Sequence, residues 1–369
     1  MELTVAKADL QKELQLCQGV VEKRSTIPIL SNVLLKAADA RLQIAATDLD
    51  VTIRCDADAQ QIKSQGAICV QARKLFDIAR LLPDAPVSFR KEDNEWVTVE
   101  CDRSKFRLPG ISKETFPELP GFKSTPLKLP ASLLKTLIDR TIFAITQEEG
   151  RYTLSGAKFE LDKKDVKMVT TDGHRLAYVA TKNGSKDSSG ELDVLIPRKT
   201  LAELTKLTSD FDGDISLGSD ENHVYFQVGS RLLISRLLSG QFPNYEMVMP
   251  KNNDRSAMFD TAALNQAVRR VALMADDRSH AIRFHLSKEQ LLISSQNAEE
   301  GEARETLETD FAGDDTDIGF NAQYLQEFLN VVGTDKVAFE FKDGNSQAQL
   351  RPVSDDNHEY KYIVMPMRL

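Results

Sequence analysis

Cysteine and tryptophan are scarce in this chain of 369 residues, which has four cysteines and one tryptophan. The cysteines form no CxxC pair and no metal-ligand spacing, so we expect free thiols in a reducing compartment, with no bound metal and no other cofactor. No apolar run approaches the roughly 20 residues that a membrane-spanning helix needs. The first residues, MELTVAKADLQKEL, also lack the basic and apolar regions of a secretory signal. These absences favour a cytoplasmic protein that does not contact a membrane.

Common catalytic signatures are also lacking. The sequence has no GxSxG turn, no Walker loop, no HExxH and no Cys–His signature. One stretch, TTDGHRLAYVAT at 170–181, nevertheless places Asp172 two residues before His174, with Arg175 following. Asp172 could orient His174 as a general base, or the stretch could form part of a binding surface. Since no nucleophile, metal cluster or cofactor loop is in register with His174, the binding interpretation is favoured.

The overall composition is that of an ordinary soluble protein, with 41% hydrophobic and 28% charged residues. At about 100 to 150 residues per domain, the length predicts two or three domains. The net charge of −9 argues against a surface covered with phosphate-binding residues. It leaves room for a local basic surface.

The sequence repeats itself about every 125 residues. GAICVQARKLFDIARLL (66–82), LDVLIPRKTLAELTKL (192–207) and TDIGFNAQYLQEFLNVV (316–332) share one layout, an apolar strand followed by a helical pattern. Arg73, Arg198 and Gln323 fall at the matching position, with offsets of 125 and 125. A second set aligns on Asp48, Asp172 and Asn297. We therefore predict three domains, at 1–125, 126–252 and 253–369.

Each domain reads as two copies of a strand, a helix and three strands. The expected helices are 7–22, 73–82, 130–145, 198–207, 261–274 and 321–332. Alternating apolar segments separated by turns such as KEDNE and KDGN surround them. The predicted class is α+β, with antiparallel sheets that carry helices on one face.

Positive charge is concentrated in the expected helices. They hold 12 Lys and Arg against 7 Asp and Glu, a net +5, so the remainder of the chain carries −14. If the six helices share one face, that face would attract polyanions in a salt-dependent manner. Alternatively, Lys and Arg are present only because they are good helix formers. Three basic repeats also suggest a closed ring of two chains.

The motifs and their order resemble the beta subunit (sliding clamp) family of the bacterial replicative DNA polymerase, polymerase III. The resemblance spans the chain and rests on STIPILSNVLL (25–35), ATDLDVTI (46–53), TDGHRLA (171–177), IPRKTLAEL (196–204), FPNYEMVMP (242–250), IGFNAQYL (318–325) and YIVMPMRL (362–369). It implies three clamp domains per chain and a head-to-tail homodimer that forms a closed six-domain ring. Helices would line the hole around duplex DNA, bound without sequence preference. The ring would be a non-catalytic processivity factor that tethers the polymerase, and a clamp loader would open it.

The resemblance also implies a cleft for short peptides of the polymerase and other replication and repair proteins. Soft methionine side chains suit a surface that accepts several partners. The alternative for the last segment is an edge strand packed on its own core. Arg175 and Arg368 would rim the cleft, and Met247 stands where the family often has a basic residue. The expected cleft residues are Leu154, Thr171, Gly173, His174, Arg175, Leu176, Pro243, Met247, Val248, Ile363, Val364, Met365, Pro366, Met367 and Arg368.

Contacts to DNA are implied for Arg24 and Arg73, and Arg198 is added as the repeat equivalent of Arg73. Solvated cations at helix ends are the alternative for Arg24 and Arg73. The loop at 146–156 would be a third contact, with Glu148 in place of a family amide and Thr153 in place of a second tyrosine. The carboxylate should repel phosphate, whereas Tyr152 could stack on an exposed base.

The expected seam between two chains would join domain 1 of one copy to domain 3 of the other. The resemblance assigns to it Lys74, Phe106, Leu108, Leu273 and Met274. Internal packing is the alternative for Leu108. Two other functional classes compete with a clamp, namely a hydrolase centred on His174 and a monomeric peptide-binding scaffold without DNA.

Overall fold

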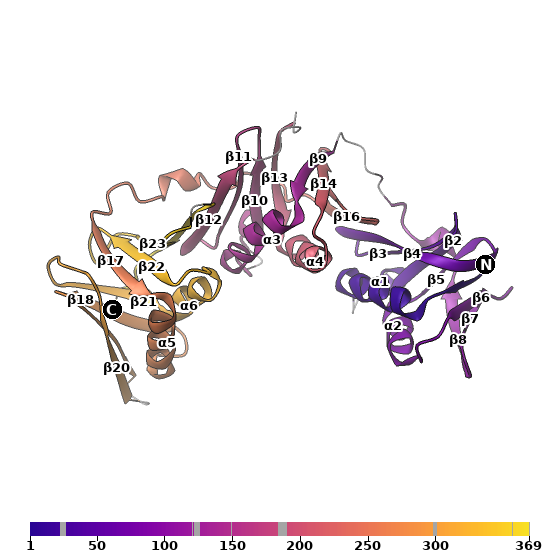
Figure 1. Cartoon of the computed structure of the whole chain (residues 1–369), viewed down its shortest axis with the longest axis horizontal. Helices are drawn as coiled ribbons and strands as arrows, with labels where there is room; N and C mark the ends of the chain where they lie inside the picture. The colour runs from indigo at the N-terminus through magenta and orange to yellow at the C-terminus, as the bar shows by residue number, and fades with distance from the viewer. Residues whose placement is uncertain are drawn as a thin grey trace. The chain divides into compact units, whose positions relative to one another are not determined.

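The structure is a computed structural model of the whole chain (Figure 1). It describes residues 1–22, 27–119, 121, 126–148, 150–183, 190–297, 301–355 and 357–368. The described residues contain no helix that is long and apolar enough to cross a membrane.

The expected order of one strand, one helix and three strands, occurring twice, is present in all three repeats. The first repeat comprises β1 (Glu2–Val5), α1 (Lys7–Val20), β2 (Asn32–Ala38), β3 (Arg41–Thr47), β4 (Val51–Ser64), β5 (Gly66–Gln71), α2 (Ala72–Leu81), β6 (Val87–Lys91), β7 (Trp96–Cys101) and β8 (Ser104–Ile111). The second comprises β9 (Leu127–Pro130), α3 (Ala131–Asp139), β10 (Gly156–Leu161), β11 (Asp165–Thr171), β12 (Arg175–Lys182), β13 (Leu192–Pro197), α4 (Arg198–Thr208), β14 (Asp214–Ser219), β15 (His223–Val228) and β16 (Arg231–Arg236). The third comprises β17 (Arg255–Asp260), α5 (Thr261–Val271), β18 (Ala281–Ser287), β19 (Gln290–Asn297), β20 (Gly301–Glu308), β21 (Thr316–Asn321), α6 (Ala322–Val331), β22 (Lys336–Phe341), β23 (Ala348–Pro352) and β24 (Glu359–Val364).

Several helices are shorter than expected. The helix expected at 130–145 ends at Asp139, and the one expected at 261–274 ends at Val271. In both cases a 3₁₀ turn follows, at Ile142–Ala144 and at Ala272–Met274. A 3₁₀ turn continues the apolar spacing of an α-helix for a few residues, so the sequence pattern alone does not separate the two.

The chain divides into two compact units, residues 1–135 with 199–237 and residues 136–198 with 238–369. The first unit holds an antiparallel sheet in the order β1-β6-β7-β8-β5-β2-β3-β4-β16-β15-β14-β9. The second holds the sheets β13-β10-β11-β12-β24-β23-β22-β17 and β20-β19-β18-β21. The division between the units falls within the middle repeat, because its strand β16 pairs with β4 of the first repeat and its strand β12 pairs with β24 of the third.

Helices cover one face of the sheets. In the first unit α1 packs against α2 and against β3 and β4, and in the second α5 packs against α6 and β20 (Figure 1). Leu10, Leu14 and Cys17 of α1 are fully buried in this layer, as their helical spacing predicts. The opposite face of each sheet is therefore left for other segments of the chain.

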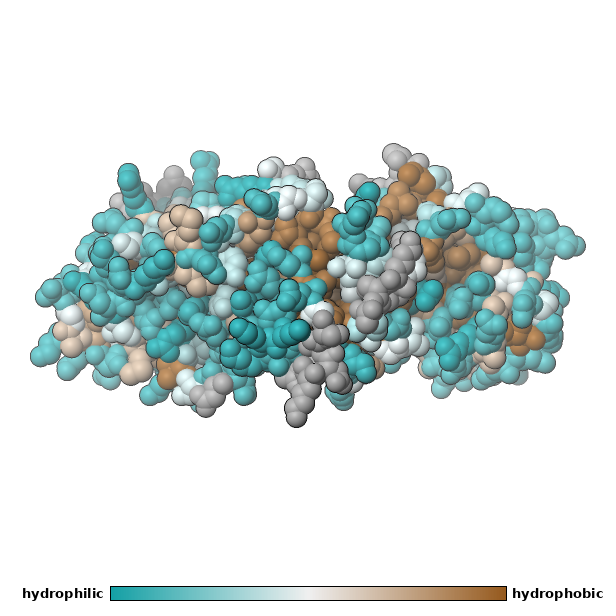
Figure 2. All heavy atoms as spheres, turned by 90° about the horizontal axis from the view of Figure 1, so that it is seen from above, coloured by the Kyte–Doolittle hydropathy of each residue, from teal (hydrophilic) through white to brown (hydrophobic). Residues whose placement is uncertain are grey.

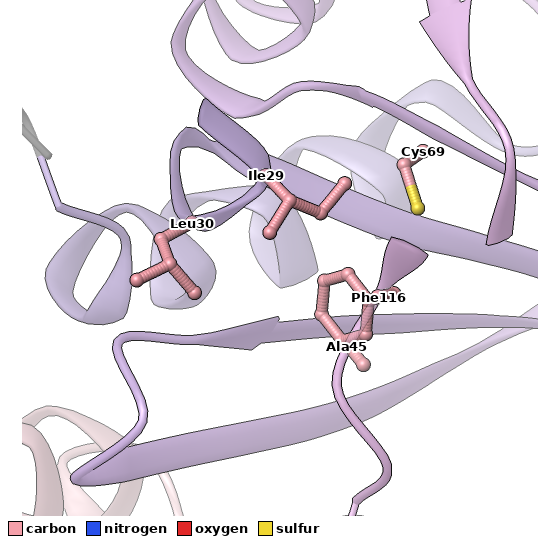
Figure 3. Close-up of a cluster of buried hydrophobic side chains, with 5 residues drawn as sticks. All are labelled: Ile29, Leu30, Ala45, Cys69 and Phe116. Atoms are coloured by element: carbon pink, nitrogen blue, oxygen red, sulfur yellow. The ribbon is translucent and has the colours of Figure 1, made fainter. Parts of the chain in front are cut away.

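Segments that follow the last strand of a repeat cross this opposite face. Phe116 packs with Ile29, Leu30, Ala45 and Cys69 in the first repeat (Figure 3). Phe242 and Tyr245 pack in the same way on Val169, Leu176 and Ile363 in the second unit. The face of the molecule drawn in Figure 2 is mainly hydrophilic, with hydrophobic residues gathered in limited patches.

The register of the repeats differs by one residue from the sequence alignment. Gln71, Pro197 and Asn321 each end the strand before the second helix of a repeat, so offsets are 126 and 124 rather than 125 and 125. The equivalent of Arg73 is consequently Lys199, and the assignment of Arg198 to that position is wrong. Aligning on the strand ends and the buried leucines of these helices would have given the correct register.

Candidate peptide-binding cleft

A tight turn between β11 and β12 contains the Asp172-Gly173-His174 stretch. The Thr171 hydroxyl donates to the Arg175 carbonyl at 2.6 Å and accepts from the Gly173 N–H at 3.0 Å. Asp172 Oδ1 accepts from the backbone N–H groups of His174 and Arg175, at 2.9 and 3.0 Å. Gly173 has a φ of +90°, a conformation that other residues adopt only with strain.

This geometry answers the question of a catalytic pair. The Asp172 carboxylate bonds the backbone of His174, not its imidazole, and Asp172 Oδ2 lies 3.0 Å from Nε of Arg175. The same turn occurs in the first repeat, where Asp48 Oδ1 accepts from the N–H groups of Asp50 and Val51. A carboxylate that recurs in this way without a histidine shapes the turn.

Arg175 is buried, with a residue exposure of 7%, and it also lines the cavity beside this turn. Its guanidinium forms ion pairs with Asp172 and Glu327 and donates to the Phe143 carbonyl at 2.8 Å. It also lies 4.2 Å from the ring centroid of Tyr324. Burial opposes ionisation of Arg175, but its interactions with Tyr362 and Glu327 outweigh this and raise its pKa. Arg175 therefore ties the turn to helix α6.

An apolar cavity of about 130 Å³ opens beside this turn. Val248 and Met365 stand at its surface, 44% and 45% exposed, whereas Leu176 and Ile363 are buried beneath them. The structure brings together at this cavity ten of the residues expected from the sequence, namely Leu154, Thr171, Gly173, His174, Arg175, Leu176, Pro243, Val248, Ile363 and Met365. A hydrophobic hollow with a few polar groups at its edge is the usual form of a ligand-binding pocket.

The remaining expected cleft residues lie elsewhere. Met247 is 76% exposed and does not line the cavity, and Val364 is buried in β24 opposite Arg175. Met367 and Arg368 line a different cavity, on the sheet β20-β19-β18-β21, because the Met367 N–H bonds the Gly319 carbonyl of β21 at 2.8 Å. In the sequence, Pro366 lies between Met365, which lines the first cavity, and Met367, which lines the second.

Sequence reasoning missed three contributors to this site. Asn244 and Tyr245 line the cavity, and Arg151 donates to the Asp172 carbonyl from outside it. Burial and the charge of Glu160 raise the pKa of Tyr245 to about 12, so its phenol stays neutral at physiological pH. The signal that could have found Tyr245 is its neighbour Pro243, which places the same short segment at the cavity.

The expected DNA-contact residues are placed as follows. Arg73 is exposed at the start of α2, and Tyr152 is 54% exposed. Arg198 donates to the Ile145 carbonyl at 3.1 Å. Arg24 lies outside the described residues, and Thr153 is half-buried beside Tyr152.

The Glu148 carboxylate is paired with the Arg151 guanidinium at 3.0 Å. The positive charge of Arg151 therefore partly offsets the repulsion between Glu148 and a phosphate. The identity of residue 148 alone does not indicate this pairing.

The expected seam residues are mostly at the surface. Leu273 is 73% exposed, Phe106 is 37% exposed, and Lys74 is exposed. Met274 is half-buried, and Leu108 is 9% exposed, so Leu108 packs largely within its own chain. The described residues contain no group of three or more His, Cys, Asp and Glu positioned to hold a metal ion.

Comparison with known proteins resolves the family. Three family models of the DNA polymerase III beta subunit match consecutive parts of the chain, the N-terminal domain at residues 1–120, the central domain at 128–244 and the C-terminal domain at 246–368. The chain belongs to the DNA polymerase III beta subunit family. The resemblance drawn from the sequence is thereby confirmed, as is a fold of three clamp domains.

Relatives of known name agree with this assignment over the whole length. The beta sliding clamp of Pseudomonas putida is 37% identical, and that of Escherichia coli K12 is 34% identical, each with 100% of both chains covered. The solved structure of the DNA polymerase III subunit beta from Pseudomonas aeruginosa is 36% identical, with a TM-score of 0.94 and 100% of both chains covered. The Caulobacter crescentus pol III beta structure is 34% identical with a TM-score of 0.93 and the same coverage.

Proposed function

We propose that this chain is a DNA sliding clamp, a non-catalytic processivity factor that encircles duplex DNA as a head-to-tail homodimer. It tethers the replicative polymerase and other replication and repair proteins through the cleft beside Val248 and Met365. Its membership of the beta subunit family over the full length carries this proposal. The domains are taken as 1–125, 126–252 and 253–369, and the site of action as the bacterial cytoplasm.

The sheet topology supports closure into a ring. The fourth strand of a repeat pairs with the last strand of the next one, as β4 pairs with β16 and β12 pairs with β24. The strand that corresponds to β4 and β12 in the third repeat is β20, which is one of the two edge strands of its sheet among the described strands. The strand that corresponds to β16 and β24 in the first repeat is β8. Pairing of β20 with β8 of a second copy would continue the same rule.

Charge along these two strands is complementary. β20 carries Glu302, Glu305 and Glu308 with one arginine, Arg304, whereas β8 carries Lys105 and Arg107. Opposite-charge pairs across antiparallel strands stabilise a sheet by roughly 0.2–1 kcal/mol each and oppose wrong registers. The exposed Phe106 and Leu273 would add apolar contact at this seam.

The helix face is proposed to surround the DNA. Arg73, Arg24 and the loop with Tyr152 would make weak phosphate or base contacts, which suits sliding because such attraction carries no sequence information. Arg198 is left out of this set, because its assignment rested on equivalence with Arg73, and that position is Lys199. A clamp loader is required to open the ring because closed strand pairing leaves no gap for duplex DNA.

Primer extension tests this proposal through the cleft. With the cognate polymerase and loader, we expect Val248→Asp to shorten products to near the length made without clamp, and to weaken polymerase binding tenfold or more. The cause is a carboxylate placed in an apolar pocket, where it loses its hydration without gaining a partner. A tenfold loss of affinity corresponds to about 1.4 kcal/mol. Met247→Asp is the matched control, since Met247 lies beside the cavity without lining it. Full-length products with Val248→Asp, or equal loss with both variants, would contradict the cleft assignment.

A further inference from the structure

A second cavity, of about 690 Å³, lies on the sheet β20-β19-β18-β21. Leu292 and Met367 supply its apolar side chains. Around them stand three arginines, Arg283, Arg304 and Arg368. This cavity shares no residue with the cleft beside Val248.

The second cavity occupies the position in the third repeat that the cleft occupies in the second. Gly156 and Ala281 begin equivalent strands, since each pairs with the last residue of the strand before the second helix, so Leu154 corresponds to Ser279. Val169 pairs with Lys158, and Ser294 pairs with Arg283. Each of these partners lies two positions after the start of its strand, so Val169 and Ser294 are also equivalent.

The same register extends to the neighbouring strands. Thr171 pairs with Leu176 in the second repeat, and Gln296 pairs with Glu302 in the third. The cleft residues Leu154, Thr171 and Leu176 thus have Ser279, Gln296 and Glu302 as counterparts, and all three line the second cavity. The third repeat therefore has a cavity at the same place as the cleft, with Ser279 and Glu302 where the cleft has Leu154 and Leu176.

The charge of this cavity contrasts with that of its domain. Residues 253–369 contain 12 Lys and Arg and 21 Asp and Glu, a net charge of −9. The cavity nevertheless gathers Arg283, His285, Arg304 and Arg368 around a single lining carboxylate, Glu302.

Two of these arginines already have acidic neighbours in the chain. Arg304 Nη2 lies 3.2 Å from Glu302, and Arg283 lies 2.7 Å from Asp317, which also contacts His285 at 3.0 Å. These pairs are exposed, with side-chain exposures of 52% for Arg283 and 65% for Arg304. A guanidinium has five N–H donors, so each retains donors for a further carboxylate.

We infer that this second cavity is a binding site for an acidic peptide segment of a partner protein. Leucine-like side chains of the segment would cover Leu292 and Met367, and its carboxylates would bond Arg283 and Arg368. The segment after β24 connects the two sites, because Met365 lines the cleft and Met367 lines the second cavity, two residues and at most about 7 Å apart along the backbone. The site does not require the cleft to be occupied.

Fluorescence anisotropy with a defined probe tests the inference. The probe is a fluorescein-labelled decapeptide in which aspartates surround two leucines, and its control has every aspartate replaced by asparagine. At low salt we expect the full-length protein to bind the aspartate peptide at least tenfold more tightly than the asparagine peptide. The double variant Arg283→Gln, Arg368→Gln should lose this preference. Arg304 is left unchanged because it lies on β20, the proposed seam strand.

Matched variants separate this site from the rest of the surface and from the cleft. Arg351→Gln removes another exposed arginine paired with a glutamate, Glu340, and should change binding less than twofold. Val248→Asp should also leave binding of the aspartate peptide unchanged, even if it abolishes polymerase binding. The single reversal Arg368→Glu, at an exposed position, serves if the double variant does not fold. Equal binding of both peptides, or loss with Val248→Asp but not with the arginine variants, would overturn the inference.

Discussion

Phe106→Asp is expected to convert the dimer into monomers at micromolar concentration, with a dissociation constant raised at least 100-fold. Phe106 is 37% exposed on β8, and the proposed seam would bury it next to the acidic strand β20. A carboxylate placed there would lose its hydration beside a strand that carries Glu302, Glu305 and Glu308. A 100-fold change corresponds to about 2.7 kcal/mol, which is within the cost of one buried, unpaired charge.

Sedimentation velocity measures this outcome directly. Leu273→Asp should act in the same direction from the other side of the seam, because Leu273 is 73% exposed at the end of the α5 region. Met258→Asp is the control, since Met258 is 42% exposed on β17 and stands outside the seam strands. A Phe106→Asp protein that still sediments as a dimer, like the control, would refute the β8–β20 seam.

Arg175→Ala is expected to lower the free energy of unfolding by about 3–5 kcal/mol. Truncation leaves Asp172 and Glu327 without their shared cation and the Phe143 carbonyl without a donor, all around a residue that is 7% exposed. The turn that shapes the cleft and its connection to α6 would loosen together. Hydrogen exchange of the amides of residues 171–177, alongside chemical unfolding, measures the effect at the site itself.

Two further variants give this experiment its controls. Arg351→Ala removes an arginine that is 45% exposed and paired with Glu340, and such a pair contributes at most about 1 kcal/mol. Arg175→Lys keeps the charge but lacks the planar fork that reaches several partners at once, so it should rescue only part of the loss. Equal stability of Arg175→Ala and Arg351→Ala would mean that the buried network contributes little.

The repeated fold could be predicted from sequence because each repeat carries the same two periodicities. Leu10, Leu14 and Cys17 at helical spacing, and alternating apolar residues in the flanking segments, fix the element types. The exact register could not be predicted in this way. The ends of the equivalent strands are 126 and 124 residues apart, whereas the sequence alignment used a constant spacing of 125. This difference of one residue placed Arg198, in place of Lys199, opposite Arg73. Aligning on the strand ends and on the buried leucines Leu75, Leu201 and Leu325 distinguishes these alternatives.

The cleft was predicted largely through family resemblance, and the structure adds its physical basis. Thr171 was predicted as a cleft residue, but Glu327, the ion-pair partner of Arg175, lies 152 positions away along the chain. No local pattern connects residues at that separation. The separate position of Arg368 likewise depends on a backbone hydrogen bond of Met367 to β21, which the composition of the last residues does not encode.

The central claim is topological, and retention on DNA tests it most directly. The protein is loaded with its cognate loader and ATP onto a nicked circular plasmid, half of the sample is linearised, and both halves are gel-filtered. A ring that encircles DNA predicts co-elution with the circle and loss from the linear form, because the protein slides off free ends. Equal retention on both forms would mean ordinary electrostatic binding and would contradict the clamp. Retention on neither, with a loader shown to be active on a known clamp, would also contradict it and would leave only a peptide-binding scaffold.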